Sequence, residues 1–298
     1  MCKTERMIAM KFAVSSWSFM QYIRAGRMDY PNCIAKAKEM GFDAIEFAAF
    51  PEGVDPIEYA KMLRAESDRV GIPICNFAVG ADFLNGSDGD TAAEIAKVKT
   101  LVDAAEIMGC ETLRHDVTGG PRPRTWQGYD TVVGKLADAC REITEYAKAK
   151  GIKTMTENHG LFSQDSLRVE KLINTVASDN FGQLVDMGNF LCADDDPVLA
   201  VGRCAPYAFY VHAKDFIIKS GNSADPGEGF ALTRGGNFRR ATIIGHGSVP
   251  VVQCLRALKS AGYDGYIAIE FEGIEDCIEG IRIGLDNLKH YVAEAYGG

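Results

Sequence analysis

Eight short apolar segments, each followed by a longer amphipathic segment, run through almost the whole chain and restrict its fold more than any other feature. The apolar segments predict strands at residues 12–16, 44–47, 72–78, 112–116, 152–157, 183–186, 209–214 and 266–271. The amphipathic segments predict helices near residues 31–40, 56–70, 90–108, 128–150, 166–178, 197–204, 249–261 and 276–295. Eight strand–helix units within 298 residues are typical of an α/β protein whose single domain is a closed (β/α)8 TIM barrel.

Residue types at the ends of several predicted helices agree with this division. Asp55-Pro56 places an N-capping side chain before a proline of the first turn, and Ser248-Val249-Pro250 predicts a second start of the same kind. Four predicted helices are followed by a glycine and then, within three residues, by a predicted strand: Gly41, Gly71, Gly109 and Gly151. The helix boundaries therefore have local support besides the hydrophobic periodicity.

Residues 1–298 are predicted to form one domain, because no stretch rich in Ser, Pro or Gly divides the chain. Residues 1–10 form an N-terminal extension before the first strand. Residues 218–247 look irregular and hold seven glycines together with Arg234, Arg239 and Arg240. A long loop here follows the seventh strand, on the barrel face that carries active sites, and predicts a lid or substrate contacts. A plain surface hairpin is the alternative interpretation.

The charge balance and the cysteines narrow the class of protein. Asp and Glu total 41 against 32 Lys and Arg, a net charge of −9, which argues against a nucleic-acid partner. The first residues lack the apolar run of a signal peptide, and no stretch approaches the roughly 18 apolar residues of a membrane span.

The nine cysteines form no CxxC pair and suit buried positions in a reducing cytosol. We therefore expect a soluble, cytoplasmic protein that binds neither membranes nor nucleic acid; a homo-oligomer is compatible with these features.

Polar residues gather where the later strands end. Side chains alternate along a strand, and barrel strands are buried on both faces, so an inward polar residue at a strand end calls for an explanation. On the eighth strand, the apolar side chains of Ile267, Ile269 and Phe271 suit contact with the helix layer. Because side chains alternate, the residues between them are expected to point into the barrel. Three side chains on each of the fifth to eighth strands are expected to face inward. They are Met155, Glu157 and His159 on the fifth; Leu184, Asp186 and Gly188 on the sixth; Tyr210, His212 and Lys214 on the seventh; and Ala268, Glu270 and Glu272 on the eighth.

Glu157, Asp186, His212 and Glu270 are therefore expected to meet at the mouth of the barrel. Three carboxylates packed together repel one another strongly, and a divalent cation relieves that repulsion. Mixed oxygen and nitrogen ligands suit Mn²⁺, Mg²⁺, Co²⁺ or Zn²⁺ better than a sulfur-preferring ion. Any one of these residues alone would more often be structural, but four in register predict a single metal site.

The motifs around these residues resemble a known family. They read TENHG at 156–160, VDMGN at 185–189, VHAKD at 211–215 and GYDG at 262–265, the last leading to Ile269-Glu270. In this order and spacing, from residue 12 to at least 273, they resemble the xylose-isomerase-like TIM-barrel superfamily. Within it they resemble the sugar isomerase/epimerase branch, with its tagatose 3-epimerase and inosose dehydratase relatives. The resemblance implies that the four residues bind one metal ion, commonly manganese, and that Glu157 and Glu270 also act as the acid/base pair.

The resemblance further implies a divalent-metal-dependent isomerase or epimerase that acts on a carbohydrate, a sugar or related polyol-ketone, through an enediolate. The alternative is a dehydratase, a lyase that removes water from an inosose or related keto-polyol on the same metal site. Two readings are less favoured: a hydrolase like the apurinic endonucleases of the superfamily, which needs more histidines than the five present, and a non-catalytic sugar-binding barrel. Tagatose-3-epimerase-type members carry a histidine three residues after the sixth-strand aspartate. Asn189 stands there in this chain and argues against free ketohexoses as substrates.

Five residues are predicted to bind the substrate. His159 and Lys214 lie one inward step beyond the metal ligands, and Asn189 occupies the histidine position just described. Glu46 ends the second strand and suits a substrate hydroxyl, while Trp17 suits a wall of the sugar pocket. Each of the five also has a purely structural interpretation.

Three other residues are ambiguous. Arg114 and His115 both end the fourth strand, and only one of them can point inward. His246 lies between Gly245 and Gly247, and we expect it in a turn rather than at a metal.

Overall fold

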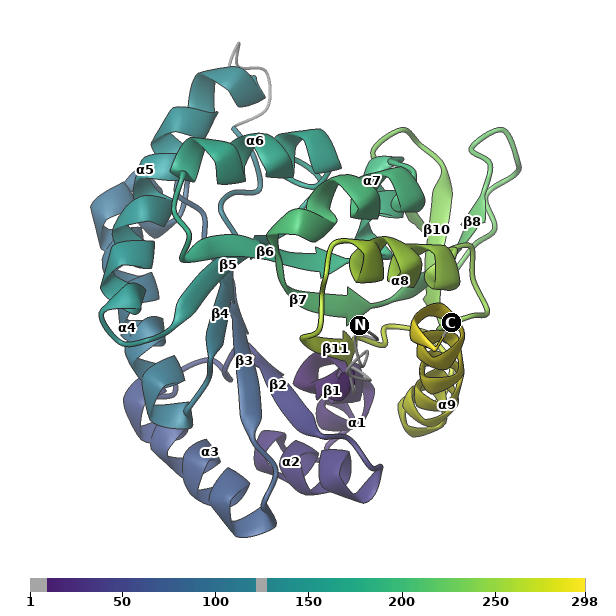
Figure 1. Cartoon of the computed structure of the whole chain (residues 1–298), viewed down its shortest axis with the longest axis horizontal. Helices are drawn as coiled ribbons and strands as arrows, with labels where there is room; N and C mark the ends of the chain where they lie inside the picture. Colours follow the sequence, from purple (N-terminus) through teal and green to yellow (C-terminus); the bar gives the residue numbers. More distant parts are fainter. Residues whose placement is uncertain (1–9, 122–127, 298) are drawn as a thin grey trace, which may run out of the picture.

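The chain folds into a closed barrel of eight parallel strands in a computed structural model, which describes residues 10–121 and 128–297 (Figure 1). In order around the barrel the strands are β1 (Lys11–Ser15), β2 (Ala44–Ala48), β3 (Ile74–Val79), β4 (Thr112–His115), β5 (Lys153–Glu157), β6 (Phe181–Asp186), β7 (Ala208–Ala213) and β11 (Tyr266–Ile269). Strand β11 pairs with β1 and closes the barrel. The TIM-barrel prediction is confirmed, with strand ends shifted by up to a few residues. Residues 1–9 of the predicted N-terminal extension lie outside the described residues.

All eight predicted helices are present in the described part of the chain and surround the strands (Figure 1). They are α2 (Tyr30–Glu39), α3 (Pro56–Val70), α4 (Thr91–Met108), α5 (Tyr129–Lys148), α6 (Ser166–Val176), α7 (Pro197–Cys204), α8 (Val251–Ser260) and α9 (Cys277–Tyr296). A short helix α1 (Met20–Arg24) and the 3-10 turns η1 (Ser16–Phe19), η2 (Ser87–Gly89), η3 (Asn189–Ala193) and η4 (Ala205–Tyr207) complete the set. None of the described helices combines the length and apolar character that crossing a bilayer requires.

The helix-end signals are correct with one exception. The Asp55 carboxylate accepts hydrogen bonds from the backbone N–H groups of Ile57 and Glu58, and α3 ends at Gly71 with a left-handed φ of 74°. The predicted cap at Ser248 is wrong, because α8 begins beyond Pro250 and no side chain caps it. The backbone N–H of Ser248 instead donates to the carbonyl of Phe216, which ties this segment to the chain after β7.

Two hydrophobic layers fill the fold. A small cluster lies inside the barrel and consists of Ala13, Ala44, Cys75, Met155, Leu184, Tyr210 and Ala268. Its members on β5, β6, β7 and β11 are the ones predicted to face inward, and Ile267, Ile269 and Phe271 pack in the larger outer layer as predicted. Because apolar side chains fill the barrel interior, polar side chains one step further along the same strands reach its open C-terminal end.

The eight described cysteines are buried and free of disulfides, as expected; Cys2 lies outside the described residues.

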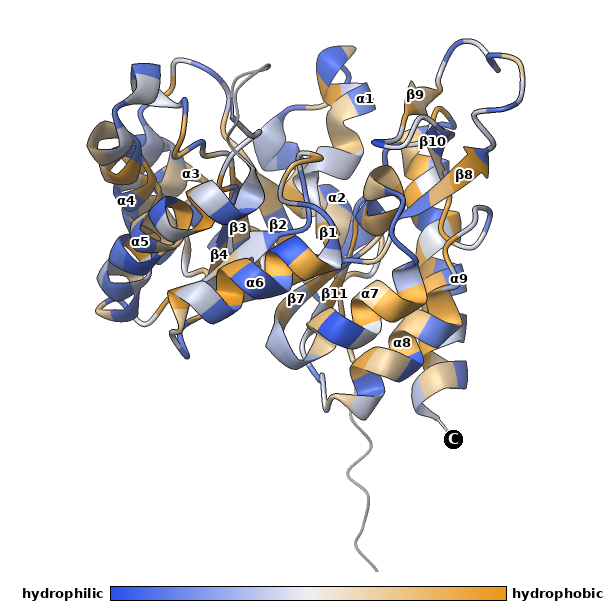
Figure 2. Ribbon diagram, turned by 90° about the horizontal axis from the view of Figure 1, so that it is seen from above, coloured by the Kyte–Doolittle hydropathy of each residue, from blue (hydrophilic) through white to orange (hydrophobic). Residues whose placement is uncertain are grey.

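The stretch 218–247 combines irregular segments with short strands, among them an antiparallel pair like the surface hairpin given as the alternative interpretation. Strands β8 (Asp215–Lys219), β9 (Ala231–Leu232) and β10 (Phe238–Thr242) form a small antiparallel sheet in the order β8-β10-β9. Figure 2 shows this sheet at the same end of the molecule as α1 and opposite the C-terminus. The sheet begins only two residues after β7, and that short connection keeps it at the C-terminal end of the barrel.

Side chains tie this segment to the loops after β5 and β6. The Arg234 guanidinium donates to the Asp165 carboxylate at 2.9 Å and to the carbonyl of Ala193 at 3.1 Å. The Asp194 carboxylate accepts from the Thr233 hydroxyl at 2.7 Å. The segment therefore lies on the catalytic face, held by hydrogen bonds to two of the loops that surround the barrel mouth.

Candidate metal centre and active site

Four side chains meet at the mouth of the barrel. Glu157 and Asp186 are the last residues of β5 and β6, His212 is the penultimate residue of β7, and Glu270 directly follows β11. One ligand atom from each of them lies within 4.8 Å of the other three. Asp186 and His212 are at most 1% exposed. The parallel strands bring them together because all carboxyl ends of the barrel strands meet at one rim.

Two buried atoms of this cluster, Oδ2 of Asp186 and Nδ1 of His212, form no hydrogen bond among the described residues. Each does lie near a charged group: Lys214 Nζ is 3.3 Å from Oδ2 of Asp186, and Glu270 Oε2 is 3.4 Å from Nδ1 of His212. The other oxygen of Asp186 is satisfied, since it accepts from the backbone N–H groups of Gly188 at 2.8 Å and Asn189 at 2.9 Å. A buried polar atom that forms no hydrogen bond leaves room for an ion or a ligand to bind it. The oxygen and nitrogen atoms present therefore fit a divalent cation with mixed ligands.

The electrostatics of the cluster agree with this fit. Burial alone would lower the pKa of His212, but Glu46 and Glu270 outweigh burial and raise the pKa well above its ordinary value. Burial would likewise raise the pKa of Glu270, but Lys214 and His212 hold that pKa well below its usual range. The carboxylates thus create a strongly negative pocket that attracts a proton or a cation to the imidazole.

Lys214 reaches the same cluster from the end of β7. Its Nζ lies 2.5 Å from Oε2 of Glu270, 3.3 Å from Oδ2 of Asp186 and 3.4 Å from Oε2 of Glu272. The side chain is only 4% exposed. Burial would lower the pKa of this amine, but Asp186 and Glu270 outweigh burial and raise it well above its ordinary value, so the ammonium stays charged.

Two donors hold Glu157 in place. Arg114 Nη2 lies 2.8 Å from Oε2 of this carboxylate, and the Asn189 amide donates to Oε1 at 2.8 Å. Arg114 also pairs with Asp116 at 2.7 Å. Burial raises the pKa of Glu157, although Arg114 opposes the shift. Of the two candidates on the fourth strand, Arg114 is thus the inward one, while the His115 ring packs outward against aromatic rings.

A cavity of about 260 Å³ opens above this cluster. Its polar and aromatic lining consists of Trp17, Arg114, Asp116, Glu157, His159, Lys214, Glu270 and Glu272. Three of the predicted substrate contacts therefore line it. His159 is half exposed with Nδ1 3.0 Å from Oδ1 of Asp116, and Trp17 donates its indole N–H to Glu272 at 2.6 Å. His246 lies outside this lining, in an exposed turn, as expected.

Glu46, predicted to contact the substrate, lies outside the lining of this cavity. Both its carboxylate oxygens lie within hydrogen-bonding distance of His212 Nε2, and the side chain is fully buried. The Asn76 amide donates to the same carboxylate at 2.8 Å. Glu46 does not reach the cavity because it extends across the barrel toward β7. Asn189 is also buried below the cavity, where it contacts Glu157.

Asp116 and Glu272 were not predicted as site residues, although both line the cavity. The period-two rule already predicted that Glu272 faces inward, and the same rule applied from Arg114 could have found Asp116. Asp116 lies two residues after Arg114, and Glu272 two residues after Glu270, so each is the next inward position beyond a site residue.

Comparison with known proteins places this arrangement in a family. A family model described as "Xylose isomerase-like TIM barrel" matches residues 34–291. The chain belongs to this family. This xylose isomerase-like chain is 26% identical to an uncharacterised protein of Methanocaldococcus jannaschii, over 97% of its own length and 92% of that protein. It is 22% identical to an inosose dehydratase of Serratia proteamaculans, with 82% of each chain covered.

Solved structures are similar at lower identity. The IOLI protein with a bound zinc atom gives a TM-score of 0.73 at 16% identity, covering 96% of this chain and 99% of that one. D-psicose 3-epimerase from Clostridium cellulolyticum H10, solved with D-tagatose, gives 0.73 at 17% identity, covering 95% and 99%. At these identities the likeness shows the fold alone.

Proposed function

We propose that this xylose isomerase-like protein is a divalent-metal-dependent isomerase or epimerase of a sugar or a related polyol-ketone. One observation carries the proposal. Glu157 and Glu270 converge from β5 and β11, and one ligand atom of each lies within 4.8 Å of a ligand atom of Asp186 and of His212. A pair of carboxylates beside a cation suits proton transfer next to a carbonyl.

A divalent cation bound by the four residues would polarise the substrate carbonyl and stabilise negative charge on its oxygen. Mn²⁺ is the first ion to test, followed by Mg²⁺, Co²⁺ and Zn²⁺, because all four accept oxygen and nitrogen ligands. The bound zinc of the IOLI protein supports including Zn²⁺ in this set.

The protein's own residues then carry the proton. One of Glu157 and Glu270 removes the proton from the carbon next to the carbonyl, and the other returns a proton to the opposite face or to the adjacent carbon. Arg114 and Asn189 fix the Glu157 carboxylate for this step, and Lys214 holds Glu270 and offers an ammonium to a substrate oxygen.

A dehydratase is the second candidate, and the similarity to an inosose dehydratase favours it. The first step is the same removal of a proton next to the carbonyl. The hydroxyl on the following carbon then takes a proton and leaves as water, while the carbon–carbon double bond forms. His159, which pairs with Asp116 at the cavity rim, is placed to supply that proton.

The two candidates are separated by incubating the metal-loaded protein with ketoses and inososes in D2O and following the products by NMR. An isomerase or epimerase incorporates deuterium next to the carbonyl and yields an isomer of the substrate. A dehydratase yields a product that lacks one water. Exchange in neither class of substrate, with metal bound, would refute both candidates.

A further inference from the structure

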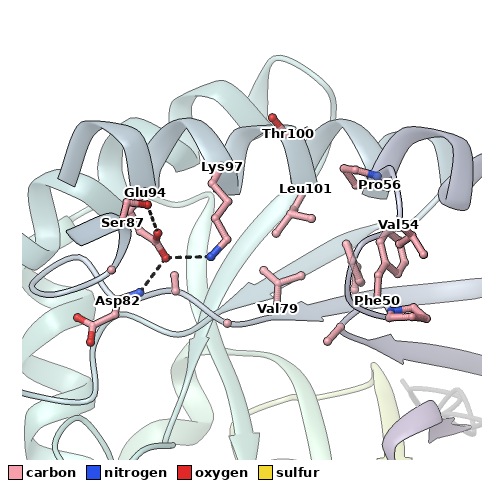
Figure 3. A pocket seen from close by; sticks show the side chains of 16 residues that line it. Phe50, Val54, Pro56, Val79, Asp82, Ser87, Glu94, Lys97, Thr100 and Leu101 are labelled. Atoms are coloured by element: carbon pink, nitrogen blue, oxygen red, sulfur yellow. Dashed lines mark hydrogen bonds and ion pairs between the residues drawn. The ribbon is translucent and has the colours of Figure 1, made fainter. Parts of the chain in front are cut away.

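A second cavity, of about 700 Å³, lies beside the candidate active site, between the loops after β2 and β3 and the helices α3 and α4 (Figure 3). Its wall is largely apolar and includes Phe50, Val54, Pro56, Val79 and Leu101. Phe50 stacks on Phe77 with ring centroids 4.5 Å apart, so an aromatic surface forms one side. The cavity lies on the catalytic face, because both loops follow carboxyl ends of barrel strands.

The polar groups of this cavity already bond to one another. The Glu94 carboxylate, 2% exposed, accepts from the Ser87 hydroxyl at 2.7 Å and from the backbone N–H of Asp82 at 3.2 Å, and it lies 3.5 Å from Lys97 Nζ (Figure 3). The Thr100 hydroxyl donates to the carbonyl of Ala96 at 3.2 Å. The hydroxyls of a second sugar would therefore compete with bonds already made, whereas an apolar group needs no polar partner.

The two cavities adjoin. Ala49, Val79 and Gly80 line both the apolar cavity and the cavity above the metal centre. None of these residues has a side chain larger than that of valine, so the boundary between the two cavities is made of small side chains. The cavity above the metal centre has a volume of about 260 Å³ and the apolar cavity about 700 Å³. Most of the combined volume of the two cavities therefore belongs to the apolar one.

We propose that the apolar cavity binds an aryl substituent of the substrate, so that the substrate is an aryl glycoside of a keto-sugar rather than a free sugar. This inference rests on the proposed function, because the polyol-ketone part is assigned to the metal centre. The aryl ring would lie against Phe50 and Leu101, which gains free energy by removing apolar surface from water.

Two binding measurements on the metal-loaded protein test this. The first is a ¹⁹F NMR titration with 4-fluorobenzyl alcohol, an aryl probe without a sugar. The second compares the methyl and phenyl glycosides of one keto-sugar by calorimetry. We expect the phenyl glycoside to bind at least about tenfold more tightly than the methyl glycoside.

Substitutions locate the effect. Ala81→Phe fills the apolar cavity, which Ala81 lines, and should abolish both the phenyl preference and the binding of the aryl probe. It should leave the methyl glycoside unaffected. Ala92→Phe adds the same ring at an exposed position in the first turn of α4, outside the cavity lining, and should behave as wild type. Leu101→Ala provides a second test by removing part of the wall, and should weaken aryl binding severalfold.

The outcomes are distinguishable. Equal affinity for the two glycosides, or aryl-probe binding that survives Ala81→Phe, overturns the inference and leaves the proposed function standing. Aryl-probe binding that Ala81→Phe abolishes, without proton exchange in any keto-sugar, refutes the proposed function but supports an aryl ligand here. A dimer that dissociates in Ala81→Phe, together with no aryl binding, shows that a second copy occupies the cavity and overturns the inference.

Discussion

Nε2 of His212 lies 2.9 Å from one carboxylate oxygen of Glu46 and 3.0 Å from the other, although 166 residues separate the two along the chain. This contact fixes the plane of the imidazole and favours a proton on Nε2, so Nδ1, which faces Asp186 and Glu270, is the atom we propose as a metal ligand. The Asn76 amide in turn donates to Glu46, and the Thr112 hydroxyl donates to Asn76. A chain of buried hydrogen bonds thus supports one proposed metal ligand from three other strands.

Glu46→Gln should weaken metal binding by about 10- to 100-fold, because the neutral amide no longer holds and polarises the imidazole. Calorimetric titration with Mn²⁺ measures the change. Glu272→Gln is the matched control, since Glu272 lies at the same mouth without contacting His212. Unchanged affinity in Glu46→Gln would show that Glu46 does not position the metal ligand.

The purified protein should bind one divalent metal ion per chain. The ion should stabilise the fold, by about 2.7 kcal/mol when its concentration is 100 times its Kd, because it binds only the assembled site. Asp186→Ala and His212→Ala should each lose both binding and stabilisation. Elemental analysis and thermal unfolding with and without added metal provide the readouts. A wild-type protein with several metal ions, or one whose stability ignores every metal tested, would contradict the assignment.

Glu157→Gln and Glu270→Gln should each lower turnover by about 10²- to 10⁴-fold, since each removes a proton-transferring carboxylate while preserving its shape. Deuterium incorporation next to the substrate carbonyl measures the step directly. Metal content must be checked in both variants, because each residue is also a proposed ligand. Full activity in either variant would refute its acid/base role.

Stability should fall as the pH drops from about 6.5 to about 4, because of His115. Burial lowers the pKa of His115 from 6.5 to about 4, so the unfolded chain takes up a proton across this range before the folded one does. Protonation therefore favours unfolding, by up to about 3 kcal/mol at the acid end of the range. Urea denaturation of wild type and His115→Gln across this range provides the comparison. A similar pH slope in both proteins would assign the acid sensitivity to other groups.

Free fructose, tagatose and psicose should be poor substrates. Asn189 replaces the histidine of tagatose-3-epimerase-type relatives, and its amide is committed to Glu157 at 2.8 Å. A site whose polar groups are mismatched to a substrate can reject it by roughly 10⁴-fold. Steady-state kinetics on the three sugars decide the matter. A kcat/KM of about 10⁴–10⁸ M⁻¹s⁻¹ on any of them would show that Asn189 does not redirect specificity.

Hydrophobic periodicity predicted the eight barrel strands, and on the fifth to eighth strands it also predicted the inward face, because both depend on local rules. Met155 and Glu157, for example, lie two residues apart on β5 and point to the same side, the first into the apolar plug and the second to the mouth. The same spacing on β6, β7 and β11 predicted which polar residues meet. Parallel strands end at one rim, so closure of the barrel was sufficient to bring them together.

The partner of Glu46 was beyond sequence reasoning, because it depends on how far each strand extends along the barrel axis and which side chains face one another across it. The sheet β8-β10-β9 was anticipated only as a possible surface hairpin for a related reason. Its strands are short, and their pairing with one another stabilises them more than their own periodicity does. The apolar cavity likewise exists only where two loops and two helices meet.

The sequence by itself determined the barrel and the residues at its mouth, since strand alternation is a property of neighbouring residues. Only the tertiary structure decided how those residues are supported and what lies beside them, since both depend on distances between segments far apart in the chain.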